Sequence, residues 1–372
     1  MREQRIICAS DDYQELKEYF REAGVTKIFL VCGNSARKLL IGKFFDRQEF
    51  QIDIVRFSGF HPNPLYEEAA AATTLFRKTN CDAIVAVGGG SAIDVAKCVK
   101  LWACMDPTRN FLEQTPISSD IPFLAVPTTA GTGSEATRYA VIYAQGKKQS
   151  ITHESCVPTA VFFDPSALET LPDYHRKSSM MDALCHGIES FWSVHADIES
   201  RKFSKLAIQK VLEYSDGYLT NIPTANAGML EAANLAGKAI DRTQTTAGHA
   251  MCYNLTSLYG IAHGHAAALC VSKLWPFMVE RAVGTELEVV FQELATAMGC
   301  KNIVEAIQIY DDLLMRLNLE LPVPKPEDFE YLRNSVNPVR LKNNPFPLDL
   351  ETIDQLYHQI LSKSSGMKSR GN

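Results

Sequence analysis

Three histidines lie in a long stretch of the chain that contains no charged side chain. His249, His263 and His265 fall within residues 243–272, which hold no Asp, Glu, Lys or Arg, although these types make up 22% of the chain. Ionised side chains are rarely buried unless they are paired, so this run is expected in the interior. Buried imidazoles need hydrogen bonds or a metal ion, and a hydrogen-bonded core position is the commoner case for any one of them.

A fourth imidazole lies upstream, beside a carboxylate. Asp182 and His186 are spaced i, i+4 in the sequence MMDALCHGIESFW, which predicts a helix. That spacing places both side chains on one helical face. One Asp with two or three His is a typical ligand set for a divalent metal such as Fe²⁺ or Zn²⁺. Thiolate ligation by Cys185, Cys252 or Cys270 is the alternative, although small buried thiols usually belong to the core.

Composition limits the class of protein. The chain has 372 residues, a net charge of −6 and ten Cys without a C-x-x-C pair. Its length predicts about two domains, and its negative charge argues against a nucleic-acid or anionic-membrane partner. The first residues lack the apolar segment of a signal peptide, and no apolar run is long enough to span a bilayer. We therefore expect a cytoplasmic protein with reduced, mostly buried thiols.

Residues 1–164 alternate short apolar runs with helical periods. Strands are expected at 27–32, 50–57, 83–87, 122–126 and 160–163, with a further one at 139–143. Helices are expected at 12–23, 66–78 and 94–102, and another one opens at the turn after residue 32. This alternation predicts a Rossmann-like α/β nucleotide-binding domain with a parallel sheet and helices on both faces.

From Pro165 onward the strand signal disappears, so residues 165–372 are predicted to form an all-α domain. The helical periods lie at 174–194, 198–219, 226–241, 263–283, 287–298, 303–317, 326–336 and 350–362.

Two loops rich in Gly and hydroxyl side chains follow expected strands. Residues 88–91 (GGGS) precede a helix, where glycines let the backbone approach a pyrophosphate and the helix N-terminus favours the anion. Residues 127–135 (PTTAGTGSE) offer small donors to phosphate and ribose. A tight turn and a flexible surface loop are the structural alternatives. Both loops follow parallel strands, where ligands enter open α/β sheets. Lys97, further along the first helix, fits an exposed helix position.

The order of these motifs resembles that of the iron-containing (group III) alcohol dehydrogenases. The motifs are GGGSAIDVAK at 88–97, PTTAGTGSE at 127–135, DALCH at 182–186, GHAMCY at 248–253 and AHGHAAAL at 262–269. The resemblance implies a dehydroquinate-synthase-like fold with the active site in the cleft between the two domains. It also implies that Asp182, His186, His249 and His263 bind one Fe²⁺ or Zn²⁺.

The resemblance further implies a nicotinamide cofactor bound by three turns. The expected cofactor-binding residues are Gly33, Asn34, Arg37, Gly88, Gly89, Gly90, Ser91, Asp94, Thr128, Thr129, Thr132 and Ser134. NAD-dependent members often carry an Asp after the first strand, and this chain has Gly33 at about that position. An Asp there would repel a 2′-phosphate, so NADPH is expected to serve at least as well as NADH, with Arg37 and Lys38 near the phosphate.

The chain departs from the family pattern at the proton relay. Many members have a second His four residues after the third ligand, and this chain has Tyr253 there. Tyr253, His265 or a chain of water molecules is expected to deliver the proton during carbonyl reduction, although a tyrosine with a pKa of about 10 is a different relay from a histidine.

A narrower resemblance concerns the substrate. Residues 187–194 and 256–269 are similar to the phosphonoacetaldehyde reductase (hydroxyethylphosphonate dehydrogenase) branch of the family. This implies reduction of a small phosphonate aldehyde, phosphonoacetaldehyde, to 2-hydroxyethylphosphonate. Arg138 and Arg242 are the expected partners of the anionic head, because the guanidinium fork suits an oxyanion. An ordinary surface ion pair is the alternative for each.

Other functions stay open from the sequence. A phosphonopyruvate reductase, a general iron-type alcohol dehydrogenase, and a metal-dependent synthase or lyase on the same fold are the alternatives. A nucleotide-binding sensor without catalysis would not need all four metal-ligand positions. We expect a homodimer that binds a small carbonyl or alcohol substrate, and neither nucleic acid nor a membrane.

Overall fold

The computed structural model describes residues 4–10, 12–47 and 52–362. Its N-terminal part contains a parallel sheet of six strands in the order β1-β8-β5-β4-β2-β3. The strands are β1 (Arg5–Cys8), β2 (Lys27–Cys32), β3 (Asp53–Phe57), β4 (Ala83–Gly88), β5 (Phe123–Pro127) and β8 (Ala160–Phe163). The inner strands read KIFLVC, AIVAVG and FLAVP and are buried almost throughout, as expected for strands covered on both faces.

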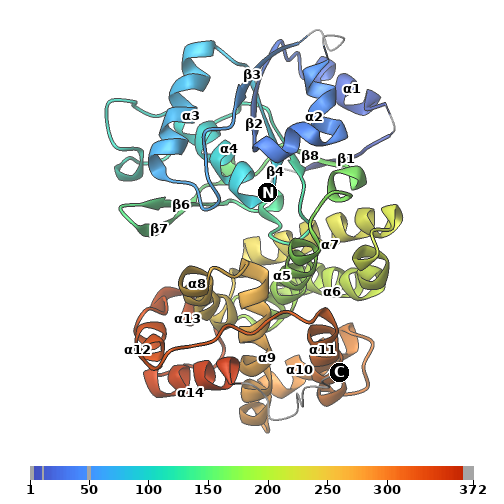
Figure 1. The fold of residues 1–372 in the computed structure, drawn as a ribbon, viewed down its shortest axis with the longest axis vertical. Coiled ribbons are helices and arrows are strands. Elements are labelled where there is room, and N and C mark those ends of the chain that lie inside the picture. Colours follow the sequence, from blue (N-terminus) through green and yellow to red (C-terminus); the bar gives the residue numbers. More distant parts are fainter. Residues whose placement is uncertain (1–3, 11, 48–51, 363–372) are drawn as a thin grey trace, which may run out of the picture.

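Helices cover both faces of this sheet (Figure 1). One face packs on α1 (Gln14–Glu22) and α2 (Leu40–Asp46), and the other on α3 (Tyr66–Thr79) and α4 (Gly90–Trp102). The expected helix after β2 starts with a short 3₁₀ turn, η1 (Asn34–Lys38), before α2. Helix α4 begins at Gly90, four residues earlier than the sequence predicts, so the end of the GGGS motif is already helical.

The turns expected to bind the cofactor start at one edge of the sheet. Cys32 at the end of β2 pairs with Val87 of β4, and Gly88 pairs with Pro127 of β5. The chain runs outward from β2 to β3 and then returns to β4 on the other side of β2. The turn after β4 therefore lies at a topological switch point, where open α/β sheets bind their ligands.

Two strands form a separate antiparallel hairpin, β6 (Tyr139–Ala144) and β7 (Lys147–Thr152). The strand expected at 139–143 thus exists, but it lies outside the parallel sheet. Strands β1 and β7 have no counterpart among the predicted strands, because RIIC is short and KKQSIT is polar. The start of the strand expected at 50–57 lies outside the described residues.

Helices make up the rest of the fold. They are α5 (Asp173–Trp192), α6 (Ile198–Leu219), α7 (Pro223–Thr243), α8 (Ala247–Tyr259), α9 (His263–Ala282), α10 (Glu286–Ala297), α11 (Ile303–Leu317), α12 (Pro326–Asn334), α13 (Pro338–Leu341) and α14 (Leu350–Leu361). They share one large apolar core, in which α5 and α9 are central. The expected class, a parallel α/β domain followed by an all-α domain, is confirmed. Helices α8 and α13 were not predicted.

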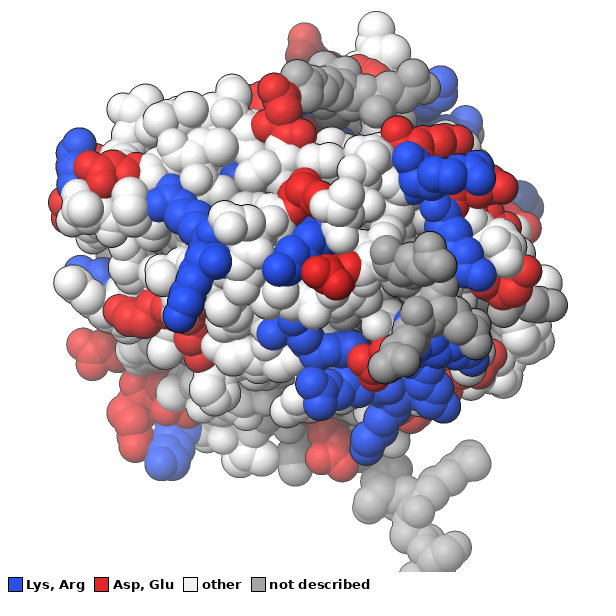
Figure 2. Space-filling model, turned by 90° about the horizontal axis from the view of Figure 1, so that it is seen from above, with Lys and Arg blue, Asp and Glu red and all other residues white. Residues whose placement is uncertain are grey.

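The molecular surface carries both signs of charge. On the face of the N-terminal domain seen in Figure 2, acidic side chains are interspersed with basic ones, and a group of Lys and Arg gathers toward one edge. Among the described helices, none combines the length and apolar character that a membrane crossing requires.

Candidate active site

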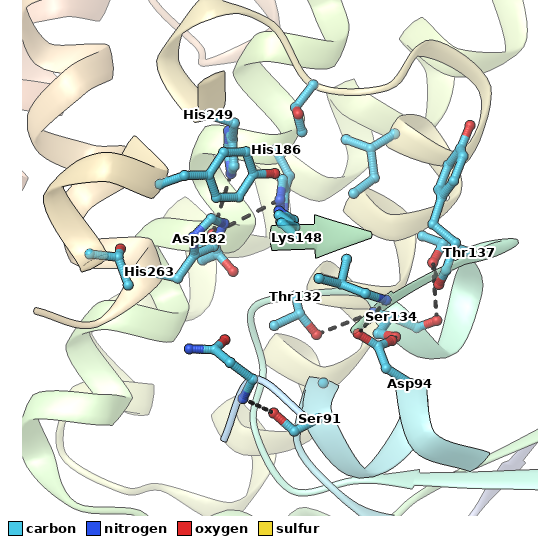
Figure 3. Close-up of a pocket in the computed structure, with 18 of the residues that line it drawn as sticks. Ser91, Asp94, Thr132, Ser134, Thr137, Lys148, Asp182, His186, His249 and His263 are labelled. Carbon is cyan, nitrogen blue, oxygen red and sulfur yellow. Dashed lines mark hydrogen bonds and ion pairs between the residues drawn. The ribbon is translucent and has the colours of Figure 1, made fainter. Parts of the chain in front are cut away.

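A cavity of about 310 Å³ lies between the sheet edge and the helical domain. One of its walls comes from the two Gly-rich loops and the other from α5, α8 and α9 (Figure 3). The expected residues that line it are Gly90, Ser91, Asp94, Thr132, Ser134, Asp182, His186, His249, Tyr253 and His263. The structure thus brings together all four expected metal ligands and five expected cofactor residues at one site.

The metal-ligand residues converge on one carboxylate oxygen. Asp182 Oδ1 lies 3.4 Å from His249 Nε2 and 3.9 Å from His263 Nε2. His186 Nε2 lies 3.9 Å from the same oxygen, and its ring stacks on that of His249 with 4.4 Å between centroids. Three helices supply these side chains: α5 carries Asp182 and His186, α8 carries His249, and α9 begins at His263.

A glycine allows this convergence. A Cβ atom on Gly264 would lie 2.1 Å from the carbonyl oxygen of Ser178 and 2.6 Å from Cβ of Asp182. Any larger residue would separate α9 from α5. Gly264 therefore lets the first turn of α9 pack directly on α5, which places the neighbouring His263 beside Asp182.

Glu189 was missed by the sequence reasoning and fixes the orientation of one imidazole. Its Oε2 accepts a short hydrogen bond from His249 Nδ1, which points Nε2 of that ring at Asp182. Its Oε1 accepts hydrogen bonds from the backbone amides of Thr246 and His249, at 3.2 and 3.3 Å. A carboxylate behind a metal-binding imidazole sets its tautomer and its basicity. The signal was present, because Asp182, His186 and Glu189 follow i, i+4, i+7 on α5.

Burial sets the protonation states of the cluster. It lowers the pKa of His186 to about 4 and that of His263 to about 3, so both are neutral imidazoles near pH 7. Burial alone would raise the pKa of Asp182, but His186, His249 and His263 hold it well below its usual range. For His249, Glu189 and Asp182 outweigh burial and raise the pKa to about 10.

This donor set fits a divalent cation. The ligand atoms of Asp182, His249 and His263 lie within 4.8 Å of one another. Bonds of about 2.1 Å in tetrahedral geometry separate ligand atoms by about 3.4 Å, so small side-chain adjustments bring all of them into range. The neutral imidazoles of His186 and His263 and the ionised carboxylate of Asp182 already have the charge states that metal binding requires. A cation would replace the proton between His249 Nε2 and Asp182.

The opposite wall is a closed hydrogen-bond network. Ser134 Oγ donates to Asp94 Oδ1 at 2.7 Å, and Asp94 Oδ2 accepts from the amide of Val141 at 3.1 Å. Lys97 is fully buried beneath this pair. Its Nζ donates to Ser134 Oγ and Thr137 Oγ1 at 3.0 Å each and to the carbonyl of Tyr139 at 2.6 Å. Lys97 is thus an interior residue that fixes the second loop, and not the surface lysine that the sequence suggested.

The second loop also contacts the helical domain. Gly133 has φ 58°, and a Cβ atom there would lie 2.5 Å from Cα of Gly237 on α7. Both the left-handed backbone and this close approach require glycine. Two residues earlier, the carbonyl oxygen of Gly131 lies 3.4 Å from His186 Nδ1. The second Gly-rich loop and the imidazole cluster are therefore in direct contact.

The remaining expected cofactor residues lie beside the cavity and do not line it. Gly88 ends β4 and Gly89 is the N-cap of α4, Thr128 and Thr129 follow β5, and Gly33, Asn34 and Arg37 belong to the turn after β2. A Cβ atom on Gly89 would lie 3.2 Å from Thr129 Oγ1, so the first two of these turns touch. Arg37 is exposed on η1.

The two expected proton donors occupy different places. Tyr253 lines the cavity, and its ring stacks on His263 with 5.2 Å between centroids. Lys148 Nζ lies 3.2 Å from the centroid of the same ring. Burial would raise the pKa of Tyr253, but Lys148 and Arg340 bring it below its usual value. His265 does not belong to the cavity lining; its Nδ1 bonds with Tyr174 Oη at 3.1 Å.

The two arginines expected at the anionic head have other partners. Arg138 Nη2 lies 2.7 Å from Asp241 Oδ2, and its Nη1 pairs with Glu154. Arg242 Nη2 lies 2.5 Å from Asp197 Oδ2, and its Nη1 lies 2.9 Å from Glu199 Oε2. Neither arginine lines the cavity, so each follows the ion-pair alternative in this structure. The cations that do line it are Lys148 and Arg340, which the sequence did not single out.

Comparison with known proteins identifies the family of this chain. The sequence profile "Iron-containing alcohol dehydrogenase" matches residues 3–165, and "Fe-containing alcohol dehydrogenase family, C-terminal" matches residues 177–361. The chain belongs to the iron-containing alcohol dehydrogenase family. The family expected from the motifs is therefore confirmed, and with it the class of oxidoreductases.

Three individual proteins show what the chain is similar to within the family. The chain is 33% identical over 228 residues to a phosphonoacetaldehyde reductase of Streptomyces viridochromogenes, a match that covers 58% of each chain. It is 29% identical to the probable alcohol dehydrogenase EutG of Escherichia coli, covering 79% of this chain and 76% of that one. The solved sulfoacetaldehyde reductase of Bifidobacterium kashiwanohense, in complex with NAD⁺, superposes with a TM-score of 0.86 at 26% identity, covering 97% of this chain and 98% of that chain.

Proposed function

We propose that this protein reduces a small carbonyl compound that carries a phosphonate, with phosphonoacetaldehyde to 2-hydroxyethylphosphonate as the first choice. The observation that carries the proposal is the cavity itself. It places an Asp and three His opposite the loops at the sheet's switch point, and it contains two cationic side chains, Lys148 and Arg340. The similarity to a phosphonoacetaldehyde reductase supports the same substrate class.

The two walls of the cavity have different proposed roles, one in cation binding and the other in cofactor binding. Asp182, His186, His249 and His263 would hold the divalent cation, for which iron and zinc both suit the N and O donors. When bound, the cation supplies Lewis-acid polarisation of the carbonyl group, and a nicotinamide cofactor supplies the hydride. Glu189 keeps Nε2 of His249 directed at the cluster by accepting from Nδ1.

Proton delivery falls to the helical wall. Tyr253 lies against His263 at the cavity surface, so its hydroxyl is the nearer of the two expected donors to the reacting group. His265 lies behind that surface, where its Nδ1 bonds with Tyr174 Oη of α5, so it does not face the reacting group. The polar side chains of Ser91, Thr132 and Ser134 face the cavity from the other wall and orient the cofactor.

The turn after β2 is compatible with NADPH as well as with NADH. The turn after β2 begins at Gly33 and carries no carboxylate up to Lys38, so nothing in η1 repels a 2′-phosphate. Arg37 and Lys38 are exposed on that turn and are the proposed partners of the phosphate.

A carbonyl-substrate panel tests the function. The protein is loaded in turn with Fe²⁺ and Zn²⁺ and assayed with NADPH and NADH against phosphonoacetaldehyde, phosphonopyruvate, sulfoacetaldehyde and butanal. We expect kcat/KM to be highest for phosphonoacetaldehyde, with one cofactor consumed per alcohol formed. Equal kcat/KM for phosphonoacetaldehyde and butanal would reduce the proposal to a general alcohol dehydrogenase. Turnover without net cofactor consumption would instead indicate a synthase or lyase.

A further inference from the structure

Arg340 is a cavity-lining guanidinium that has no carboxylate partner among the described residues. It lies on the short helix α13 and is half-buried. Its Nη1 donates a long hydrogen bond, 3.4 Å, to the amide oxygen of Gln244. Within the described part of the chain, Arg340 pairs with no carboxylate. Arg138 and Arg242, by contrast, each bind two. Arg340 therefore has donors left for an anion that enters the cavity.

Thr245, the residue that follows Gln244 in the sequence, carries a hydroxyl group in the wall of the same cavity. Thr245 lines the cavity and is only 5% exposed, and among the residues described its Oγ1 has no hydrogen-bond partner. Asn343, two residues after the end of α13, holds this segment in place, because its Nδ2 donates to the carbonyl of Thr245 at 3.1 Å. A buried hydroxyl without a partner is unfavourable, so its presence in a cavity wall indicates a group that is satisfied by a ligand.

The carboxylates of the cavity do not compete for Arg340. Asp94 is held by Ser134 and the amide of Val141, and Asp182 faces the three imidazoles. Asp94 and Asp182 are the acidic members of the lining within the described chain. An anion that binds Arg340 must therefore come from outside the protein.

We propose that Arg340 and the Thr245 hydroxyl form the subsite for the tetrahedral oxyanion head of the substrate, a role that neither Arg138 nor Arg242 is placed to fill. The guanidinium fork binds two oxygens of such a head and the hydroxyl donates to the third. Thr245 lies two residues before α8, and His249 lies in the first turn of that helix, so the subsite and the imidazole cluster belong to the same cavity. This inference rests on the proposed phosphonate substrate.

The first test measures specificity in the metal-loaded full-length protein. Arg340→Met should lower kcat/KM for phosphonoacetaldehyde by at least about 30-fold, the range for a lost charged contact with a desolvated partner. Its kcat/KM for butanal should fall much less, because a neutral aldehyde does not use the subsite and is affected by the arginine only through the pKa of Tyr253. Arg242→Met is the matched control, and it should change neither substrate. Arg340→Lys, which keeps the charge and loses the fork, should fall between wild type and Arg340→Met.

Thr245→Val separates a ligand role from a structural one. Valine keeps the shape of the side chain and removes the unpaired hydroxyl, so the melting temperature should be unchanged or higher. The same variant should raise the dissociation constant of ethylphosphonate, an inert analogue followed by calorimetry, by about 10–100-fold, the range for a hydrogen bond to a charged acceptor. If ethylphosphonate binds Arg340→Met and Thr245→Val as it binds wild type, the subsite is wrong.

The two proposals fail in different ways. If wild type does not prefer phosphonoacetaldehyde to butanal, the proposed function fails, whereas the ethylphosphonate titrations still decide the subsite. If wild type prefers phosphonoacetaldehyde and Arg340→Met keeps that preference, the function stands and the subsite is overturned. The KM values for NADPH and NADH should not change in Arg340→Met, because a rise there would assign the arginine to a cofactor phosphate instead.

Discussion

The two walls of the cavity both contain buried charge, but they use it differently. On the nucleotide side, Lys97 and Asp94 are enclosed by partners of their own domain, and every donor of the ammonium group has an acceptor. On the helical side, three imidazoles crowd around the single oxygen of Asp182 at distances of 3.4–3.9 Å. The first arrangement is complete without a ligand, and the second has the donor set of the proposed cation site. Removing a residue from either wall should therefore have opposite consequences.

The largest effect is expected from His263→Ala on the helical side. His263 is a third exposed, so its loss should leave the fold intact while it lowers metal affinity more than about 100-fold and abolishes reduction. Metal content after chelation, dialysis and reloading measures this, with thermal unfolding beside it. His175→Ala, an exposed histidine on the same helix as Asp182, is the control. Wild-type activity in His263→Ala after this treatment would show that the cluster is not the metal site.

Lys97→Met should show the reverse pattern. The change leaves Asp94 and the acceptors around Lys97 buried without the ammonium group, so the free energy of unfolding should fall by about 2–4 kcal/mol. Affinity for the metal should be unchanged, because Lys97 does not contact the imidazoles. Urea unfolding measures the first quantity and metal titration the second, with the exposed Lys78→Met as control. A loss of metal binding without a loss of stability would break the distinction between the two walls.

Glu189→Gln probes the intermediate case, a charge that acts on the metal through another residue. A glutamine cannot accept the hydrogen bond from His249 Nδ1 as strongly as a carboxylate does, so metal affinity should fall about 10–100-fold. A competition titration against a chelator would detect this. Unaltered affinity would mean that the hydrogen bond only supports packing.

The smallest effect is expected at the outer edge of the nucleotide wall. Arg37 is exposed, so Arg37→Ala should raise the KM for NADPH by only about fivefold, in line with a solvent-exposed ion pair of up to about 1 kcal/mol, and leave the KM for NADH unchanged. Steady-state kinetics with both cofactors decide it. A strong preference of the wild type for NADH would contradict the role given to this turn.

Local patterns in the sequence predicted most of the fold. Inner strands such as Ala83–Gly88 are uniform apolar runs, and Ile198–Leu219 has a clear helical period with an Asp cap at position 197. Helix α8 was missed because Ala247–Tyr259 contains no charge to mark its outer face. Strand β7 was missed because Lys147–Thr152 is polar and pairs only within its hairpin.

The site divides in the same way. Asp182, His186, His249 and His263 share a spacing or an unusual environment in the sequence, so they could be found there. Arg340 could not, because it contacts Gln244 from almost a hundred residues further along the chain, and no local pattern distinguishes it from Arg138 or Arg242. Lys97 likewise looks like any helix lysine until the hairpin β6–β7 and the second loop enclose it.

The contact between Gly133 and Gly237 has a consequence for motion. Two backbones meet there with no side chain between them, at 2.5 Å for a Cβ that neither residue has. Such a close contact leaves little room for sliding, so we expect any widening of the cleft to rotate about this point. Gly131, two residues away, carries the contact with His186, so it moves least during that rotation. Product could thus leave and cofactor exchange at the open end while the metal cluster keeps its geometry from one turnover to the next.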